Sequence, residues 1–252
     1  MEKYLTIIVP CYNEEANLKR GVLQEMLKYL TRQSVSWELI ISDDGSTDGS
    51  AKLVKTIIAK YQNCKFLGNP HGGKPAALLA GINVASGKYI LTTDMDQSTP
   101  IGELDKLLPY LNKGFDIVIG SRGVNRKNFP LYRKVGAAIF MSVRKFLILR
   151  EIKDTQCGFK LYETSVLKKA FPRLEFIRKQ KKAKGWTVTS FDVELLHIIK
   201  KMGKRIKEVE VVWHDRDISV GKGGGLNRYF KESKDMFMQV LRVKINDLKG
   251  MY

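Results

Sequence analysis

Four short apolar runs, each ending in polar residues, constrain what this chain can fold into. They cover residues 5–9, 37–41, 65–67 and 89–93, and a stretch with helical periodicity follows each one. Alternating strands and helices predict an α/β protein with a mainly parallel, doubly wound sheet. Ligands of such sheets bind along the carboxyl ends of the strands. We therefore expect the functional site among the polar residues that follow these runs.

Two aspartates one residue apart, Asp94 and Asp96, follow the fourth run. Carboxylates that converge at a strand end suit a divalent cation that clamps phosphate oxygens. A D-x-D pair alone is weak support, because surface loops carry such pairs by chance. The position after a predicted strand makes this pair a candidate metal site.

The polar residues after the other three runs form motifs of their own. They read P-C-Y-N-E-E at 10–15, S-D-D-G-S-T-D at 42–48 and N-P-H-G-G-K at 69–74. In this order, and followed by D-x-D, they resemble the nucleotide-sugar half of the family 2 glycosyltransferases, which have the Rossmann-like GT-A fold. The segments 120–122, 154–160 and 191–195 resemble the branch that glucosylates or mannosylates polyprenyl phosphates such as dolichyl phosphate. The resemblance extends from Leu5 to about Trp213.

The resemblance implies a set of nucleotide-sugar-binding residues: Pro10, Tyr12, Glu14, Asp43, Asp44, Lys74 and Asp94. Tyr12 offers a face to a base, a strand-end aspartate can accept a base N–H, and Lys74 can neutralise phosphate. An alternative for 44–48 is a turn with a helix N-cap, and both roles can coexist. Residues 72–74 are not a P-loop, because the G-x-x-x-x-G-K-[ST] spacing is absent.

The resemblance implies that Asp94 and Asp96 hold Mg²⁺ or Mn²⁺ between the two donor phosphates. It also implies that Asp96 is a catalytic residue. The metal would offset the charge that grows on the leaving nucleoside diphosphate. Mannosyl relatives carry a glutamine one position later than Gln97, so a role of Gln97 as third ligand stays open.

The acceptor constrains the mechanism. A sugar hydroxyl needs a general base, whereas a phosphate monoester, with a second pKa of ~6, is largely dianionic at pH 7 and needs cations to hold it. Arg122, Arg133 and Lys160 match the family's acceptor region, and Asp154 matches its acidic position, as a base or as a residue that orients the acceptor. The alternative for Asp154 is a structural ion pair.

Residues 187–202 are expected to form a helix. Asp192 and Glu194 lie two apart on it and so on different faces, which favours structural roles. His71, His197 and His214 are too scattered for a metal cluster. We expect His197 in the core and His214 at the end of a strand, beside the acceptor. Residues 221–225 are glycine-rich and suggest a hinge.

Charge separates the two halves of the chain. Residues 1–125 carry 14 Lys and Arg against 13 Asp and Glu, whereas residues 126–252 carry 30 against 13. No recognised nucleic-acid motif accompanies the basic half. An anionic membrane surface and an acceptor phosphate account for the asymmetry better than a uniformly basic surface does.

Two segments are candidates for membrane contact. In 226–245 the apolar positions share one helical face and Lys231, Lys234 and Arg242 lie off it, as in an interfacial helix. Docking on the chain's own domain is the alternative, and acidic residues that dilute the basic face favour it slightly. The basic run 178–184 is the better candidate. The apolar positions of the first segment are Leu226, Tyr229, Phe230, Phe237, Val240, Leu241 and Ile245.

The remaining composition indicates the compartment. The three cysteines lack metal spacing, and an odd number argues against a disulfide framework, so a reducing compartment is expected. Glu2 and Lys3 precede a strand-length run, which does not resemble a signal peptide. No apolar stretch reaches the ~20 residues of a membrane-spanning helix. We expect a peripheral protein on the cytoplasmic face of a membrane.

These observations predict a catalytic domain over 1–225, with a nucleotide-sugar half to residue 125 and an acceptor half after it, and an amphipathic helix and tail over 226–252. The expected activity is inverting, metal-dependent transfer of a hexose from a nucleotide diphosphate sugar to a polyprenyl phosphate. UDP-glucose is favoured over GDP-mannose. The alternatives are transfer to a hydroxyl of a polysaccharide, glycolipid or protein, and an inactive nucleotide-sugar-binding or scaffold protein.

Overall fold

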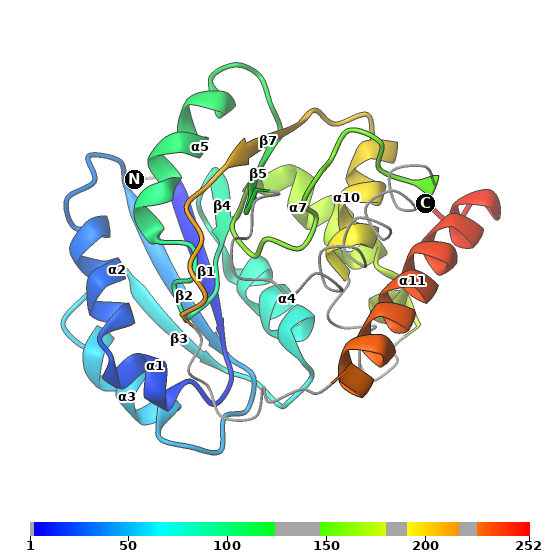
Figure 1. Cartoon of the computed structure of the whole chain (residues 1–252). Coiled ribbons are helices and arrows are strands. Elements are labelled where there is room, and N and C mark those ends of the chain that lie inside the picture. The colour runs from blue at the N-terminus through cyan, green and yellow to red at the C-terminus, as the bar shows by residue number, and fades with distance from the viewer. Residues whose placement is uncertain (1–2, 124–146, 180–190, 217–225) are drawn as a thin grey trace.

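Helices cover both faces of a central sheet in the computed structural model, which describes residues 3–123, 147–179, 191–216 and 226–252 (Figure 1). The strands are β1 (Leu5–Cys11), β2 (Trp37–Asp43), β3 (Cys64–Gly68), β4 (Tyr89–Thr92), β5 (Ile117–Ser121), β6 (Lys160–Glu163) and β7 (Ile206–Glu210). The helices are α1 (Glu15–Lys19), α2 (Val22–Leu30), α3 (Ser50–Ile58), α4 (Lys74–Val84), η1 (Ile101–Glu103), α5 (Leu104–Leu111), α7 (Thr164–Ala170), η2 (Phe171–Arg173), α8 (Glu175–Arg178), α10 (Phe191–Lys201) and α11 (Leu226–Leu248).

The sheet has the strand order β3-β2-β1-β4-β6-β5-β7. β1 pairs in parallel with β2 and β4, and β5 pairs in parallel with β7, whereas β6 is antiparallel to both its neighbours. All four strands expected from the apolar runs are present and parallel, so the prediction of a mainly parallel α/β sheet is confirmed. Strand β6, which begins at Lys160, lies between the parallel group β3-β2-β1-β4 and the parallel pair β5-β7.

Alternation along β1 directs side chains to two separate cores. Ile7 packs with α1, α2, α3 and α5 on one face, and Ile8 packs with α4, α7, α10 and α11 on the other. Both side chains are fully buried. The loops that follow β1, β2 and β4 therefore emerge at one edge of the sheet, between the two layers of helices.

Pro10 lies in the central strand β1, a position that proline usually avoids because it has no N–H to donate. The register of β1 with β4 ends at Ile8 and Thr92, before Pro10, while pairing with β2 continues to Cys11. The last bond on the β4 side runs from the Thr93 N–H to the Ile8 carbonyl. Pro10 therefore lies past the β4 ladder, one residue before the end of the strand.

The C-terminal helix α11 docks on the protein by one face and exposes an apolar face elsewhere. Val240 and Val243 are buried, whereas Met238, Ile245 and Leu248 are 53%, 50% and 75% exposed. The single apolar face expected for this segment was therefore wrong in part, because it combined buried and exposed positions. Its members Leu226, Tyr229 and Phe230 lie outside the described side chains.

Buried ion pairs fix the docked face of α11. The guanidinium of Arg242 donates to the carboxylates of Glu175 and, at 2.7 Å, Glu194. The Asn246 amide also donates to Glu175 at 2.7 Å, and the Tyr252 hydroxyl donates to Glu194 at 2.8 Å. Glu194 thus has the structural role expected for it, and docking on the domain is confirmed for this face.

Several predictions fall outside the described residues: Arg133, the glycine-rich segment 221–225 and most of the basic run 178–184. His197 is buried on α10, as expected, whereas β7 ends at Glu210, so His214 follows the strand instead of ending it. Cys11, Cys64 and Cys157 are free. In the described part of the chain, no helix has the length and apolarity needed to cross a membrane.

Candidate active site

The two aspartates after β4 are held by different groups. The Lys74 ammonium, from the first residue of α4, donates to Asp94 Oδ1 at 2.5 Å, and both side chains are 40% exposed. Burial alone would lower the pKa of Lys74, but the charges of Asp94 and Asp192 outweigh it and raise that pKa above its ordinary value. Asp96 Oδ1 accepts the Ser98 N–H at 2.8 Å. The site therefore contains two carboxylates and a cation that contacts one of them.

The loop 154–160 packs directly against Asp94. A Cβ atom on Gly158 would lie 2.1 Å from Asp94 Oδ2, a separation that no side chain tolerates. The Gly158 carbonyl accepts the Thr92 hydroxyl of β4 at 3.2 Å. Glycine at position 158 lets the later half of the chain approach the D-x-D pair closely.

Arg122 and Asp154 form a two-pronged ion pair beside this loop. Arg122 Nε and Nη2 donate to the Asp154 carboxylate at 2.7 and 2.8 Å, and the N–H groups of Arg122 and Gln156 donate to it at 3.1 and 3.0 Å. Burial would raise the pKa of the Asp154 carboxyl, but the bonds and charge of Arg122 hold it well below its ordinary value. A carboxylate with four donors and a low pKa is a poor proton acceptor, so the geometry favours an orienting role over a base.

One cavity joins the two halves of the site. Asp94 and Arg122 both line it, so a carboxylate suited to a metal and a guanidinium suited to a phosphate face one space. The Arg122 guanidinium lies 5.8 Å from the centre of the Trp213 ring. The lining is Thr93, Asp94, Ser98, Thr99, Arg122, Gln156, Cys157, Gly158, Phe159 and Trp213.

The aspartates after β2 hold the loops on either side of them. Asp43 accepts the Ser46 N–H at 3.0 Å and its hydroxyl at 2.5 Å. Asp44 accepts the N–H groups of Gly72 and Gly73 at 2.8 and 2.9 Å, and it pairs with His71 at 3.0 Å. Both aspartates are more than nine-tenths buried. The turn expected as an alternative is present, and these carboxylates tie the second and third motifs together.

Asp48 satisfies the backbone at the start of α3, where its Oδ1 accepts the Ser50 N–H at 2.9 Å. The N-cap position of α3 is Gly49, which makes no side-chain cap bond, so Asp48 satisfies this N–H from the position before the cap. Glu14 accepts the Asn17 amide at 2.6 Å. The Tyr12 ring, 44% exposed, stacks on His71 with 4.6 Å between ring centres, and this aromatic pair stands at the same strand ends.

Lys160 differs from what the acceptor motif implied. Its side chain is 1% exposed, and its ammonium donates to Asp192 at 2.6 Å and to the Cys157 carbonyl at 2.5 Å. A buried cation needs such partners, and Asp192 supplies the opposite charge from α10. Lys160 therefore holds the 157–160 loop, and the structure gives it no open path to a ligand.

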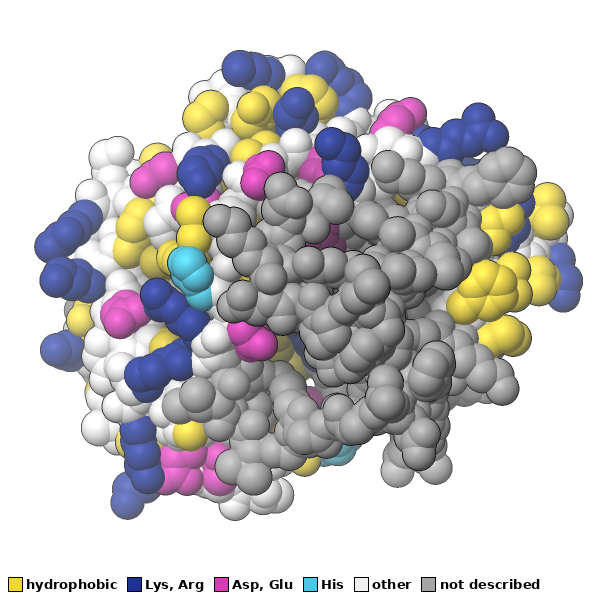
Figure 2. Space-filling model, viewed as in Figure 1, with side chains coloured by type: hydrophobic (Ala, Val, Ile, Leu, Met, Phe, Trp, Pro, Cys, Tyr) yellow, Lys and Arg dark blue, Asp and Glu magenta, His cyan; other side chains and the backbone are white. Residues whose placement is uncertain are grey.

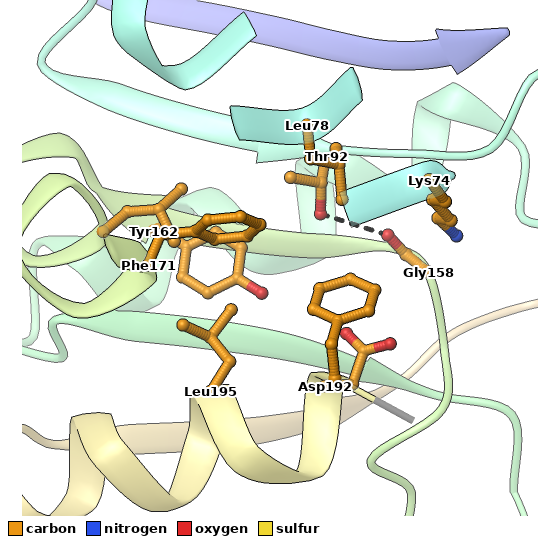
Figure 3. A pocket seen from close by; sticks show the side chains of 10 residues that line it. Lys74, Leu78, Thr92, Gly158, Tyr162, Phe171, Asp192 and Leu195 are labelled. Carbon is orange, nitrogen blue, oxygen red and sulfur yellow. Dashed lines mark hydrogen bonds between the residues drawn. The ribbon is translucent and has the colours of Figure 1, made fainter. Parts of the chain in front are cut away.

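A second, small and mainly apolar cavity lies behind Lys74 and Asp192 (Figure 3). Leu78 of α4, Tyr162 of β6 and Leu195 of α10 surround it, together with Phe171. The polar groups of Lys74 and Asp192 stand at the side nearest Gly158. This cavity adjoins the D-x-D site on the acceptor side.

Comparison with known proteins identifies the family. The family model Glycosyl transferase family 2 matches residues 6–171. The chain belongs to glycosyl transferase family 2. The match begins in β1 and ends in η2, so it contains the D-x-D pair, Arg122, and the loop 154–160.

Curated relatives in this family are named dolichyl-phosphate beta-glucosyltransferases. The protein of Dictyostelium discoideum is 33% identical over 99% of this chain and 76% of its own length. The Homo sapiens protein is 31% identical over 84% of this chain and 67% of its own length. These relatives support the polyprenyl-phosphate branch that the motifs of the later half resembled.

Solved structures show the same fold at low identity. Mannosyl-3-phosphoglycerate synthase from Rubrobacter xylanophilus has a TM-score of 0.68 at 15% identity and covers 99% of this chain and 76% of its own. Mannosyltransferase PcManGT from Pyrobaculum calidifontis, in complex with GDP-Man and Mn²⁺, has a TM-score of 0.59 at 17% identity and covers 96% and 65%. This family 2 glycosyltransferase therefore has the GT-A fold that its motifs implied.

The donor set of the D-x-D pair fits a divalent cation. Asp94 and Asp96 supply carboxylate oxygens, the ligands that Mg²⁺ and Mn²⁺ prefer. Among the described residues no group of three or more His, Cys, Asp or Glu gathers to hold a metal ion. An ion here would complete its coordination with phosphate oxygens and water, as Mg²⁺ commonly does.

Four residues contribute to the site without having been assigned a role from the sequence. His71 joins Tyr12 and Asp44, Gly158 makes room for Asp94, Trp213 faces Arg122, and Asn13 accepts the Thr47 N–H at 2.9 Å. His71 and Gly158 lie inside motifs that were recognised, so their positions were a usable signal. Trp213 reaches the site through sheet pairing of β7 with β5, which sequence does not reveal.

Proposed function

We propose that this glycosyltransferase transfers glucose from UDP-glucose to a polyprenyl phosphate such as dolichyl phosphate. The observation that carries the proposal is that Asp94, suited to a metal ion, and Arg122, suited to a phosphate, line the same cavity. The names of the curated relatives favour glucose over mannose and a lipid phosphate over a hydroxyl acceptor.

The donor would bind across the strand ends. Tyr12, next to His71, offers a surface for the base, and Glu14 and the loops held by Asp43 and Asp44 border it. Asp94 and Asp96 would hold Mg²⁺ or Mn²⁺ at the donor diphosphate. The metal, when bound, supplies positive charge that stabilises the departing nucleoside diphosphate. Lys74 is within reach of Asp94 and would add a second cation on this side.

The acceptor phosphate would bind at Arg122. Its guanidinium presents a fork that matches phosphate oxygens, and Asp154 keeps the plane of that fork fixed. A dianionic phosphate oxygen attacks the anomeric carbon as the bond from that carbon to the diphosphate breaks, with inversion. No proton leaves the nucleophile, so the reaction needs no base. This agrees with the lowered pKa of Asp154, whose carboxylate already accepts hydrogen bonds from Arg122 and Gln156.

Transfer of radiolabelled glucose to organic-extractable lipid tests the proposal. Purified protein receives labelled UDP-glucose, or GDP-mannose in parallel, with a polyprenyl phosphate and Mn²⁺ or Mg²⁺. We expect metal-dependent label from UDP-glucose in the lipid phase, and a loss of at least about a hundredfold in Asp96→Asn. Label that stays in water while the donor still binds would contradict the lipid-phosphate acceptor.

We also propose that the exposed face of α11 rests on an anionic membrane surface. Phe237, Met238, Ile245 and Leu248 supply the apolar part, and hydrophobic side chains gather over this helix at the right-hand edge of the molecule (Figure 2). The only acidic residue of 237–252, Asp247, is turned inward and pairs with Lys201 at 3.0 Å. The apolar side chains can enter the membrane interface, and no outward-facing acid among residues 237–252 repels anionic headgroups. The net positive charge of residues 126–252 attracts the same headgroups.

Sedimentation with vesicles tests this surface. We expect wild type to bind vesicles that contain phosphatidylserine, and Ile245→Ser with Leu248→Ser to bind at least about tenfold more weakly, since less apolar surface enters the lipid. Val84→Ser, at a position 43% exposed on α4, is the matched control and should bind normally. A concentration-dependent dimer that the double variant abolishes would instead assign this face to a second copy of the chain.

A further inference from the structure

The turn that carries Asp96 is conformationally strained. Gln97 has a φ of 52°, in the left-handed region that side chains other than glycine rarely adopt. In the described part of the chain, the other non-glycine residue with a positive φ is Asn13. It follows the end of β1, in the same site. Such conformations persist where surrounding contacts hold them.

Bonds within the turn hold the Asp94 side of it. The Gln97 N–H and side-chain amide donate to the Asp94 carbonyl at 3.3 and 2.8 Å. This bond uses the Gln97 amide N–H₂, so the side chain points back into its own turn. These contacts do not fix the Asp96 carbonyl, which belongs to the peptide that precedes the strained residue.

A side chain from outside the turn binds that carbonyl. Arg20, the residue after α1, donates from Nη2 to the Asp96 carbonyl at 2.9 Å. Its Nη1 donates to the Arg216 carbonyl at 2.5 Å. One guanidinium therefore bridges two backbone segments that lie 76 and 196 residues from it in the sequence.

The segment joined in this way forms a wall of the site. The His214 N–H donates to the Ser98 carbonyl at 2.8 Å, so residues 213–216 run along the turn. Trp213 of this segment lines the cavity beside Arg122. The bridge from Arg20 thus joins the turn of the metal-binding pair to the side of the cavity where the acceptor phosphate is proposed to bind.

We propose that Arg20 is a positioning residue that holds the D-x-D turn and the Trp213 segment in register. It acts through the backbone carbonyls of Asp96 and Arg216, and not as a ligand of the metal ion or of the donor. The planar fork is what the role requires, because two separate N–H donors must point at two carbonyls at once. A lysine has one ammonium on a flexible stem and would hold at most one of them well. The catalytic consequence rests on the proposed function, whereas the structural bridge does not.

The sign of the effect on metal affinity separates this role from a simple charge effect. Removing a cation near two carboxylates would, by charge alone, strengthen the binding of Mn²⁺. Loss of the bridge should weaken it, because Asp96 would no longer be presented in one arrangement. The test compares Arg20→Ala and Arg20→Lys with Lys19→Ala, which removes a neighbouring cation that pairs with Glu15 at 2.6 Å.

Mn²⁺ binding in the presence of UDP is measured by electron paramagnetic resonance on the full chain. We expect Arg20→Ala to weaken Mn²⁺ about tenfold, Arg20→Lys to recover only part of this, and Lys19→Ala to bind as wild type does. Tighter Mn²⁺ binding in Arg20→Ala, or equal changes in Arg20→Ala and Lys19→Ala, would overturn the proposal.

Hydrogen exchange supplies a readout that needs no metal. Peptides that contain residues 94–99 and 211–216 should exchange faster in both Arg20 variants, while peptides from β1 and β2 keep wild-type rates. Unchanged exchange in both segments would refute the bridge. If wild type itself binds no Mn²⁺, the metal part of the proposed function fails, and the exchange result still decides the role of Arg20.

Discussion

Acidic side chains are held by different partners on the two sides of this active site. On the donor side, Asp43, Asp44 and Asp48 accept backbone N–H groups of nearby loops. On the acceptor side, Asp154 and Asp192 pair with Arg122 and Lys160, each 32 residues away. Asp43, Asp44 and Asp48 thus rest largely on backbone hydrogen bonds, whereas Asp154 and Asp192 each have a side-chain cation as partner, to which Asp154 adds two backbone N–H groups.

The difference predicts how each side responds to substitution. A backbone N–H remains after any side-chain replacement, and one unsatisfied buried polar group costs ~1–3 kcal/mol. Removing one member of a buried ion pair leaves a charge without its partner, which costs ~3–5 kcal/mol. The later half of the chain should therefore be the more sensitive to loss of single charges.

The largest effect is expected at the pairs that dock α11. Arg242→Met leaves Glu175 and Glu194 without their shared cation. The free energy of unfolding should fall by about 3–5 kcal/mol, measured by urea denaturation at pH 7. Lys19→Ala, which breaks the exposed pair with Glu15, should change it by less than about 1 kcal/mol. Equal effects of the two variants would break the comparison.

Glu38 in β2 is an exception that sharpens the comparison, because it is a buried acid of the donor half that uses side-chain partners. Burial would raise its pKa, but bonds from Ser86, Thr6 and Lys65 outweigh this and hold the pKa at about 2. A carboxyl with a lowered folded pKa stabilises the protein above its unfolded pKa of about 4.5, and this stability is lost as the pH falls towards 2.

Glu38→Gln should therefore lower the free energy of unfolding by about 3 kcal/mol at pH 7, from the difference between those two pKa values. The gap between variant and wild type should shrink progressively between pH 4.5 and pH 2. Urea denaturation at pH 7, 4 and 3 measures it. A gap that stays constant with pH would assign the loss to packing instead of charge.

The smallest of the three effects is expected where the two sides touch. Gly158→Ala places a Cβ atom 2.1 Å from Asp94 Oδ2, so the carboxylate or the loop must move. Glucosyl transfer should fall about ten- to a hundredfold, because small displacements of reacting groups are costly. Gly102→Ala, whose Cβ would lie 3.9 Å from Tyr29, is the control and should retain activity. A fully active Gly158→Ala would show that the two sides are not closely coupled.

The fold and the position of the site could be predicted from sequence because both depend on local patterns. Apolar runs of strand length gave β1 to β4, although β1 and β2 extend two residues further, to Cys11 and Asp43, through their shared register. The D-x-D pair and the 154–160 loop were found by motif, and Asp94 and residues 156–159 line one cavity.

The functions of individual carboxylates and cations were harder to predict. Lys160 matched the acceptor motif but is buried at the start of β6, where Asp192 of α10 pairs with it. The apolar stripe of α11 was visible in the sequence, but which side docks depends on Glu175 and Glu194. Partners this far apart in the chain leave no periodicity or spacing to detect.

By itself, then, the sequence determined the layers of this protein, the family it belongs to and the edge of the sheet where its motifs gather, since side-chain alternation and turn chemistry act over a few residues. Only the tertiary structure decided which acids face the cavity and which hold neighbouring loops in place. An acid takes a ligand-binding or a structural role according to the donors that the fold brings within about 3 Å of it. At Asp44, Asp154 and Asp192 the side chains and N–H groups that decide this include ones from residues 27 or more positions away.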